Sequence, residues 1–82
     1  MSGEKRQHKR LPWSEPAKIV SIANTPVGDC LIKDISATGA RLWVRVPELV
    51  PDWFTLHMSG GLTPKCGVRW RHGNEIGVQF GK

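Results

Sequence analysis

Short runs of alternating apolar and polar residues make up most of the chain beyond residue 16, and turn-forming residues separate them. In residues 40–46, ARLWVRV, Leu42 and Val44 would point to one face and Arg41 and Trp43 to the other. This period of two is typical of a strand with one buried face. Similar segments predict further strands at residues 17–22, 27–36, 53–58, 62–71 and 75–80.

Six short strands in a chain of 82 residues favour a small closed β-barrel, because closure pairs the edges that an open sheet would expose. No segment has the spacing of an amphipathic helix, and 9 Gly and 6 Pro would interrupt a long one. Residues 1–12 lack hydrophobic periodicity, so we expect a flexible basic arm there and the barrel domain in residues 13–82.

The strand predicted at residues 62–71 carries a tryptophan whose environment the pattern also predicts. Val68 and Trp70 share one face by alternation, so we expect Trp70 to pack in the core, with stacking against a nucleobase as the alternative. Arg69 and Arg71 alternate with them and are expected to form a solvated face.

The chain is basic, with 12 Lys and Arg against 7 Asp and Glu and a formal net charge of +5. Residues 5–10 alone hold 4 of these 12 cations. A basic balance favours an anionic partner, which could be a polymer or a small molecule. No apolar run could cross a bilayer, and no hydrophobic segment follows the basic start as in a signal peptide. We therefore expect a cytoplasmic protein with no membrane partner.

The sequence lacks the usual catalytic and metal-binding patterns. His8, His57 and His72 are far apart and there is no Cys-x-x-Cys, so we expect no metal site. No nucleophile-elbow motif is present, so we expect neither an enzyme nor a cofactor. Cys30 and Cys66 are expected to be free thiols, because a small secreted domain usually has more cysteines. A disulfide between them stays open at this point.

Residues 33–42, KDISATGARL, join two predicted strands and carry polar turn residues. Asp34 and Ser36 can bond backbone N–H groups. Gly39 can adopt a conformation that strains other residues, and it also lets a ligand approach the backbone. A hydrogen-bonded turn before a strand accounts for this pattern as well as one side of a ligand site does.

Two arginines of the basic arm, Arg6 and Arg10, are spaced so that both can act on one ligand. They would lie about 6 Å apart on a helical turn and about 13 Å apart, on the same side, in an extended chain. A guanidinium can bond guanine O6 and N7, pair with phosphate oxygens or stack on a base. With the turn at residues 34–39, these arginines could hold a compact guanine nucleotide.

The motif Arg6-x-x-x-Arg10, followed by Asp34-x-Ser36-x-x-Gly39, resembles the paired signature of the PilZ domain. The ending CGVRWRHGNEIGVQF is similar to the closing hairpin of that family. PilZ domains are bacterial receptors for the second messenger cyclic di-GMP. The resemblance therefore implies an all-β fold, a six-stranded antiparallel barrel of the split-barrel type. Many members add a C-terminal helix, which this chain is expected to lack because it ends directly after the last strand.

The resemblance also implies a role for each motif residue. Arg6 and Arg10 would contact guanine edges and phosphates. Asp34 would accept hydrogen bonds from guanine N1–H and N2–H₂, Ser36 would donate one to the ligand, and Gly39 would leave room for it.

Four further residues are secondary candidates for ligand contact: Lys5, Lys9, Arg41 and Trp70. Many family members have an arginine at the position of Lys5, which is associated with binding two stacked ligand molecules. Lysine supplies charge without a planar fork, so the number of ligands per chain, one or two, stays open.

We therefore predict a stand-alone PilZ domain whose arm becomes ordered when cyclic di-GMP bridges it to residues 34–39. It would signal to an unidentified effector protein, as a monomer or a ligand-dependent dimer, in a process such as motility or biofilm formation. One alternative is a small basic barrel that binds single-stranded nucleic acid, although a polymer is the less favoured partner. The other is a PilZ-like interaction module without a ligand.

Overall fold

The computed structural model describes residues 14–81, and β-strands account for most of them. The strands are β1 (Glu15–Ser21), β2 (Pro26–Ile35), β3 (Gly39–Val44), β4 (Trp53–Met58), β5 (Lys65–His72) and β6 (Glu75–Phe80). A short 3-10 helix, η1 (Pro47–Leu49), lies between β3 and β4, and no α-helix occurs within the described range. All six predicted strands are confirmed, with ends that differ by at most 3 residues.

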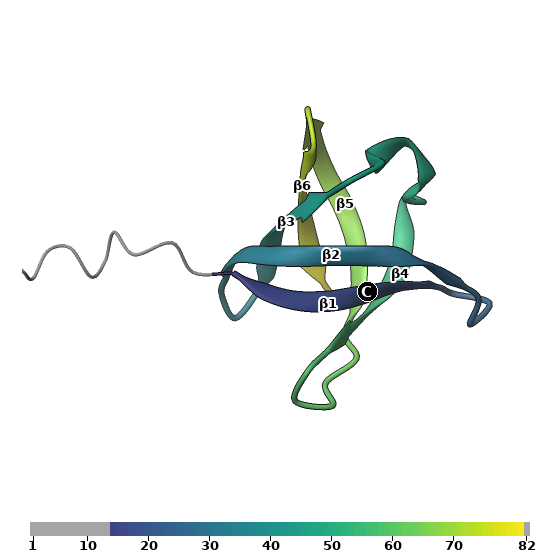
Figure 1. Cartoon of the computed structure of the whole chain (residues 1–82). Coiled ribbons are helices and arrows are strands. Elements are labelled where there is room, and N and C mark those ends of the chain that lie inside the picture. The colour runs from purple at the N-terminus through teal and green to yellow at the C-terminus, as the bar shows by residue number, and fades with distance from the viewer. Residues whose placement is uncertain (1–13, 82) are drawn as a thin grey trace, which may run out of the picture.

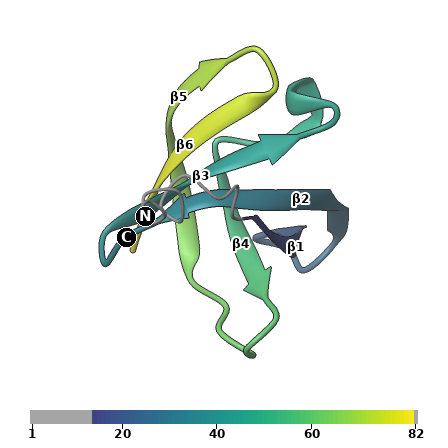
Figure 2. The same ribbon diagram turned by 60° about the vertical axis from the view of Figure 1, so that its left-hand side comes forward.

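The strands form a closed antiparallel barrel in the order β1-β2-β3-β6-β5-β4, so the predicted fold class is confirmed. β1, β2 and β3 form one meander of consecutive neighbours, and β4, β5 and β6 form a second (Figure 1). The two meanders join where β1 pairs with β4 and where β3 pairs with β6. We call the β3–β6 junction the seam; Figure 2 shows β6 there, lying between β5 and β3.

The inward faces of the strands enclose one apolar core, and no polar or charged residue within 14–81 is buried. Its buried members are Ala17, Ile19, Cys30, Ile32, Leu42, Val44, Val50, Phe54, Leu56, Cys66, Ile76 and Val78. The two cysteines are free thiols, as predicted. Loss of solvation on burial is the main cause that raises the pKa of Cys30 to about 12 and that of Cys66 to about 11.

Arg71 attaches the connection between β3 and β4 to the β5–β6 hairpin. Its guanidinium donates to the carbonyl oxygens of Pro47 (3.2 Å) and Val50 (3.0 Å) and pairs with the Asp52 carboxylate at 2.9 Å. Val50 is a core residue, so these bonds keep the connection closed over the barrel. Arg71 remains exposed, as predicted, and the folded connection in addition brings three acceptors to it.

The β5–β6 hairpin turns at Gly73 and Asn74, of which only Gly73 has a positive φ, 60°. This is the pattern of a type II′ turn, in which the first central residue is glycine. Asn74 uses its side-chain amide to donate to the carbonyl oxygens of Val44 (2.9 Å) and Arg45 (3.1 Å). The hairpin is thereby attached to the end of β3.

Candidate ligand-binding site

A β-bulge in β2 turns Asp34 to the outside of the barrel. Ile32 is fully buried and pairs with Leu42, yet the next pair along the two strands is Asp34 with Arg41. Lys33 is therefore an extra residue on β2. In a regular strand Asp34, two residues after Ile32, would face the core again, so the bulge exposes its carboxylate.

A second bulge, in β5, does the same for Trp70. Val68 pairs with Val78, whereas the next pair is Trp70 with Gly77, so Arg69 is the extra residue. Trp70 is 45% exposed on the outside of the barrel. The prediction that it packs in the core was wrong, because the bulge reverses the alternation on which that prediction rested.

Gly77 provides the surface on which the Trp70 indole lies. A Cβ atom at Gly77 would be only 2.1 Å from Nε1 and 2.2 Å from Cε2 of Trp70. The indole therefore packs directly against the backbone of β6, and any side chain at this position would displace it. The rest of the indole is free to meet a ligand.

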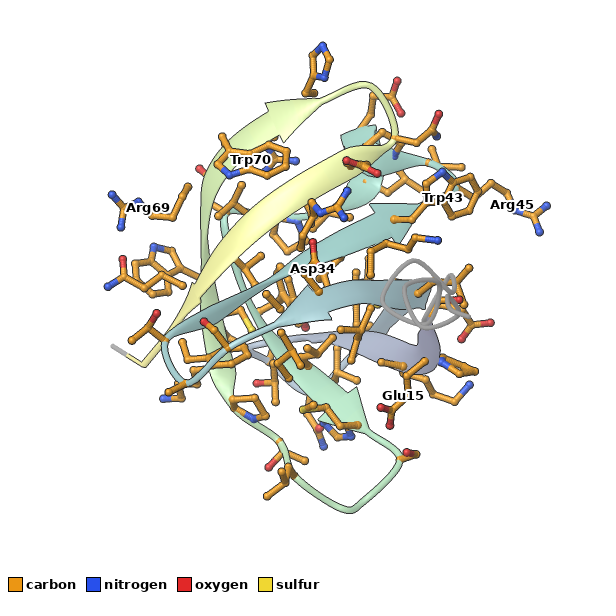
Figure 3. The ribbon with its side chains drawn as sticks, turned by 90° about the vertical axis from the view of Figure 1, so that its left-hand side faces the viewer. Glu15, Asp34, Trp43, Arg45, Arg69 and Trp70 are labelled. Carbon is orange, nitrogen blue, oxygen red and sulfur yellow. The ribbon has the colours of Figure 1, made fainter. Side chains whose placement is uncertain are left out.

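Strand register across the seam brings the two outward-turned residues into one row. In strand order β2, β3, β6 and β5, the row contains Asp34, Arg41, Gly77 and Trp70. Neighbouring strands lie about 4.8 Å apart, so the row is roughly 14 Å long. Figure 3 shows Asp34 and Trp70 on the same face of the barrel. An open pocket of about 450 Å³ covers the row, lined also by Ile35, Ser36, Thr38, Gly39, Ala40, Arg69, Val78 and Gln79.

Arg41, in the middle of the row, lies between two carboxylates from different strands. Its Nε donates to Oδ2 of Asp34 at 2.7 Å, and its Nη2 lies 2.6 Å from the same oxygen. Its Nη1 lies 3.1 Å from each carboxylate oxygen of Glu75. The hydrogen bonds with Asp34 and then with Glu75 raise the pKa of Arg41 above its ordinary value. The guanidinium is therefore a permanent positive charge that is already engaged on both sides.

The turn between β2 and β3 is closed by its own hydrogen bonds. The Ser36 amide donates to the Gly39 carbonyl oxygen at 2.8 Å, and the Thr38 amide donates to the Ser36 hydroxyl at 3.3 Å. The Phe80 amide donates to the Thr38 carbonyl oxygen at 2.8 Å, which joins the turn to β6. The hydrogen-bonded turn considered from the sequence is present, and its residues also line the pocket.

Position 39 needs glycine because β3 and β6 approach closely at the seam. Its φ is not in the positive range, so backbone conformation is not the reason. A Cβ atom at Gly39 would lie 2.2 Å from the carbonyl oxygen of Val78. Only a residue without a side chain lets β3 and β6 approach this closely. Of the two reasons for glycine that the sequence allowed, close approach therefore applies, and the approaching group is the neighbouring strand.

Two pocket residues that the sequence analysis does not name as ligand contacts are Arg69 and Gln79. The Arg69 guanidinium donates to the Gln79 side-chain oxygen, and within residues 14–81 no carboxylate pairs with Arg69. The bulge that turns Trp70 outward also brings Arg69 to the edge of the pocket. Alternation along the sequence gives no signal for either residue, because it does not reveal the bulge.

Four of the predicted contact residues lie outside the described part of the chain: Lys5, Arg6, Lys9 and Arg10. The structure does describe where the chain enters the barrel. Glu15, the first residue of β1, pairs with Ile32 of β2, which lies two residues before Asp34. The chain therefore enters the barrel at the end of β2 where the row begins.

The pocket presents a carboxylate acceptor, an exposed indole and a guanidinium that no carboxylate of residues 14–81 neutralises. This combination suits a ligand with a planar base, N–H donors and an anionic group. The same residues 14–81 contain no cluster of three or more His, Cys, Asp and Glu side chains that could hold a metal ion. They also contain no helix long and apolar enough to cross a membrane.

Comparison of the chain with curated proteins and with solved structures gave no match. The family model of the PilZ domain does match, over residues 4–82. That range includes both motifs and every strand of the barrel. PilZ domains are non-catalytic modules that bind cyclic di-GMP. Because the match spans nearly the whole chain, the chain belongs to the PilZ domain family.

Proposed function

We propose that this PilZ domain is a receptor for cyclic di-GMP and that the ligand lies over the row from Asp34 to Trp70. The observation that carries the proposal is that two bulges, on different meanders, turn Asp34 and Trp70 outward onto one face. Bulges are frequent beside functional sites, where they redirect a side chain. Membership of a family of cyclic di-GMP receptors supports the choice of ligand.

Each pocket side chain has chemistry that suits one part of the ligand. The Asp34 carboxylate accepts hydrogen bonds from the guanine N1–H and N2–H₂ donors. The Trp70 indole stacks on a guanine base, and Arg69 pairs with a phosphate. Ser36 donates its hydroxyl to the ligand, and Gly39 adds no side chain that would obstruct it.

The length of the chain between Arg10 and the barrel supports a role for the basic arm in ligand binding, at the end of the row where Asp34 lies. Arg10 lies four residues before Ser14, so even a fully extended segment between them spans no more than about 14 Å. Glu15 lies beside Ile32, at the end of β2 that leads to Asp34. Arg10 is thus tethered within reach of the guanine that Asp34 holds.

In the bound state Arg6 and Arg10 contact guanine edges and phosphates, while Lys5 and Lys9 add positive charge around them. Fixing the arm costs roughly 1–2 kcal/mol of backbone entropy per residue, which charge-assisted hydrogen bonds to the ligand must offset. The arm therefore becomes ordered on the barrel only when cyclic di-GMP is bound. An effector protein recognises the surface that the ordered arm and the ligand create.

Calorimetric titration with cyclic di-GMP tests this function, with GTP and a short RNA as control ligands. We expect saturable, guanine-specific binding of one or two ligands per chain. Arg6→Ala and Arg10→Ala should each abolish or greatly weaken it, because each removes a charge-assisted fork. If both variants bind as tightly as the unchanged chain, the proposed site is wrong. Affinity that rises with RNA length and falls steeply with salt would instead favour the nucleic-acid alternative.

A further inference from the structure

The Glu75–Arg41–Asp34 chain of ion pairs has a feature that the proposed function does not use. Arg41 directs Nε and Nη2 to a single oxygen of Asp34, Oδ2, at 2.7 and 2.6 Å. Nε donates a hydrogen bond to this oxygen and Nη2 forms an ion-pair contact with it, so both nitrogens lie against Oδ2. No donor from residues 14–81 bonds the other oxygen, Oδ1. The Asp34 side chain is 67% exposed, so Oδ1 is the atom left to meet a ligand.

One carboxylate oxygen is sufficient for the edge of guanine. N1–H and N2–H₂ are adjacent donors, and an oxygen with two free lone pairs can accept from both. Whether Oδ1 of Asp34 faces the pocket depends on the rotation of the carboxyl group, which the hydrogen bond from Nε and the ion-pair contact from Nη2 of Arg41 restrict. Arg41 in turn has its opposite side fixed by Glu75, through 3.1 Å contacts to both carboxylate oxygens.

Glu75 can affect a ligand in this pocket only indirectly, through Arg41 and Asp34. It does not line the pocket, whereas Asp34 and Arg41 both do. It belongs to β6, on the other side of the seam from Asp34 on β2. Its side chain, 34% exposed, is the least exposed of the three. Both of its carboxylate oxygens contact Nη1 of Arg41, and a partly buried ion pair restricts a guanidinium better than a fully solvated pair does.

We propose that Glu75 is a positioning residue that sets the selectivity of the pocket for guanine, by fixing Arg41 and through it Oδ1 of Asp34. This inference rests on the proposed binding of cyclic di-GMP and adds a residue and a mechanism to it. In this arrangement Arg41 supports Asp34 and does not make the direct ligand contact that the sequence suggested for it. A lysine at position 41 could not replace it, because an ammonium group lacks the separate, forked nitrogens with which Arg41 contacts the two carboxylates.

The test compares the dissociation constants of cyclic di-GMP and cyclic di-IMP, which lacks the guanine 2-amino group, for the full chain and for Glu75→Gln. Glutamine keeps the size of the side chain and removes its charge. We expect the variant to bind cyclic di-GMP roughly two- to fivefold more weakly and to distinguish the two ligands less well. In an Asp34→Asn background the Glu75→Gln change should have no further effect, because the two residues act in series.

Asp29→Asn is the matched control, because Asp29 forms an ion pair of the same length with Lys18 (3.1 Å), in a more exposed position away from the pocket, and the change in charge is the same. It should bind both ligands like the unchanged chain. Thermal melts check folding, and Glu75→Asp, which keeps the charge, should retain more selectivity than Glu75→Gln. The inference is overturned if Glu75→Gln leaves the two affinities unchanged, tightens both equally, or still acts beside Asp34→Asn. If the unchanged chain binds no cyclic di-GMP, the proposed function itself fails, which is a different result.

Discussion

At the scale of single residues, glycine occupies two positions of the site because another group needs the space. At Gly77 that group is the Trp70 indole, a side chain that can move, whereas at Gly39 it is the carbonyl of Val78, which is part of the neighbouring strand. The same substitution should therefore have different effects at the two places. A change at Gly77 displaces an aromatic ring, and a change at Gly39 pushes the two meanders apart.

We predict that Gly39→Ala destabilises the barrel by about 2 kcal/mol or more, since a Cβ atom 2.2 Å from the Val78 oxygen forces the backbone to shift. Urea denaturation followed by tryptophan fluorescence measures the free energy of unfolding. Gly28→Ala is the control, because nothing lies within 4 Å of a Cβ atom there. It should change stability by less than about 1 kcal/mol. Equal stability of the two variants would contradict the role of Gly39 in the seam.

The motif residues on the barrel could be predicted from the sequence, and Asp34, Ser36 and Gly39 do line one pocket. The reason for the glycine could not be predicted, since the Val78 carbonyl that it accommodates lies on a strand far away in the chain. Nor could the sequence predict that Arg41 is held by Asp34 and Glu75, because this depends on the pairing of three strands.

At the scale of elements, alternation predicted all six strands, but it could not predict which way each side chain points beyond a bulge. A bulge adds one residue to one strand and reverses every later side chain relative to the simple pattern. Nothing in the composition of residues around Lys33 or Arg69 marks the extra residue. Alternation therefore predicts Trp70 in the core, and it does not predict the pairing of Asp34 with Arg41.

The β5 bulge leads to a prediction for Trp70. Trp70→Ala should weaken cyclic di-GMP binding by roughly tenfold, because stacking between a base and an aromatic side chain contributes about 1–3 kcal/mol. Calorimetry measures the effect, and the unfolding midpoint should change little because the indole lies outside the core.

Trp43→Ala is the control for this measurement. Trp43 is also exposed, at 38%, but it lies beside Arg45 and away from Trp70 (Figure 3) and does not line the pocket. Its removal should leave the affinity unchanged. Equal losses from the two substitutions would indicate a general effect of losing a surface tryptophan and would count against the row as the ligand site.

At the scale of the whole molecule, the number of strands and the clustering of turn residues predicted a small barrel, and the two motifs predicted the family. The order of the strands could not be predicted, because short antiparallel strands of this kind can be connected in several ways. The pocket depends on that order. It needs β2 and β3 from one meander beside β6 and β5 from the other.

The two buried thiols make thiol reactivity and the stability of the folded barrel depend on pH in the alkaline range. The pKa of Cys66 is about 11 in the folded chain against an ordinary value of 9.0, so its thiolate fraction near pH 8 falls about a hundredfold. Iodoacetamide should therefore label both cysteines slowly in the native protein and quickly in urea, as mass spectrometry can measure. Rapid labelling of the native protein would contradict the burial of the thiols.

The same pKa values determine the direction of the effect on stability. The folded state keeps the thiol protons to higher pH than the unfolded state does, so this contribution is complete below about pH 9. It declines as the pH rises through 9 towards the folded values of about 11 and 12. Replacing Cys66 by alanine should reduce this alkaline loss of stability, measured by urea denaturation between pH 8 and 10.5.

The seam also affects how fast the chain folds. It joins residues far apart in the chain, such as Gly39 with Gln79, and proteins dominated by such distant pairings fold in about milliseconds to seconds. Each meander can form from near neighbours, but neither contains both Asp34 and Trp70. In a newly made chain, the proposed cyclic di-GMP site is therefore complete only once the two meanders have met and the barrel has closed.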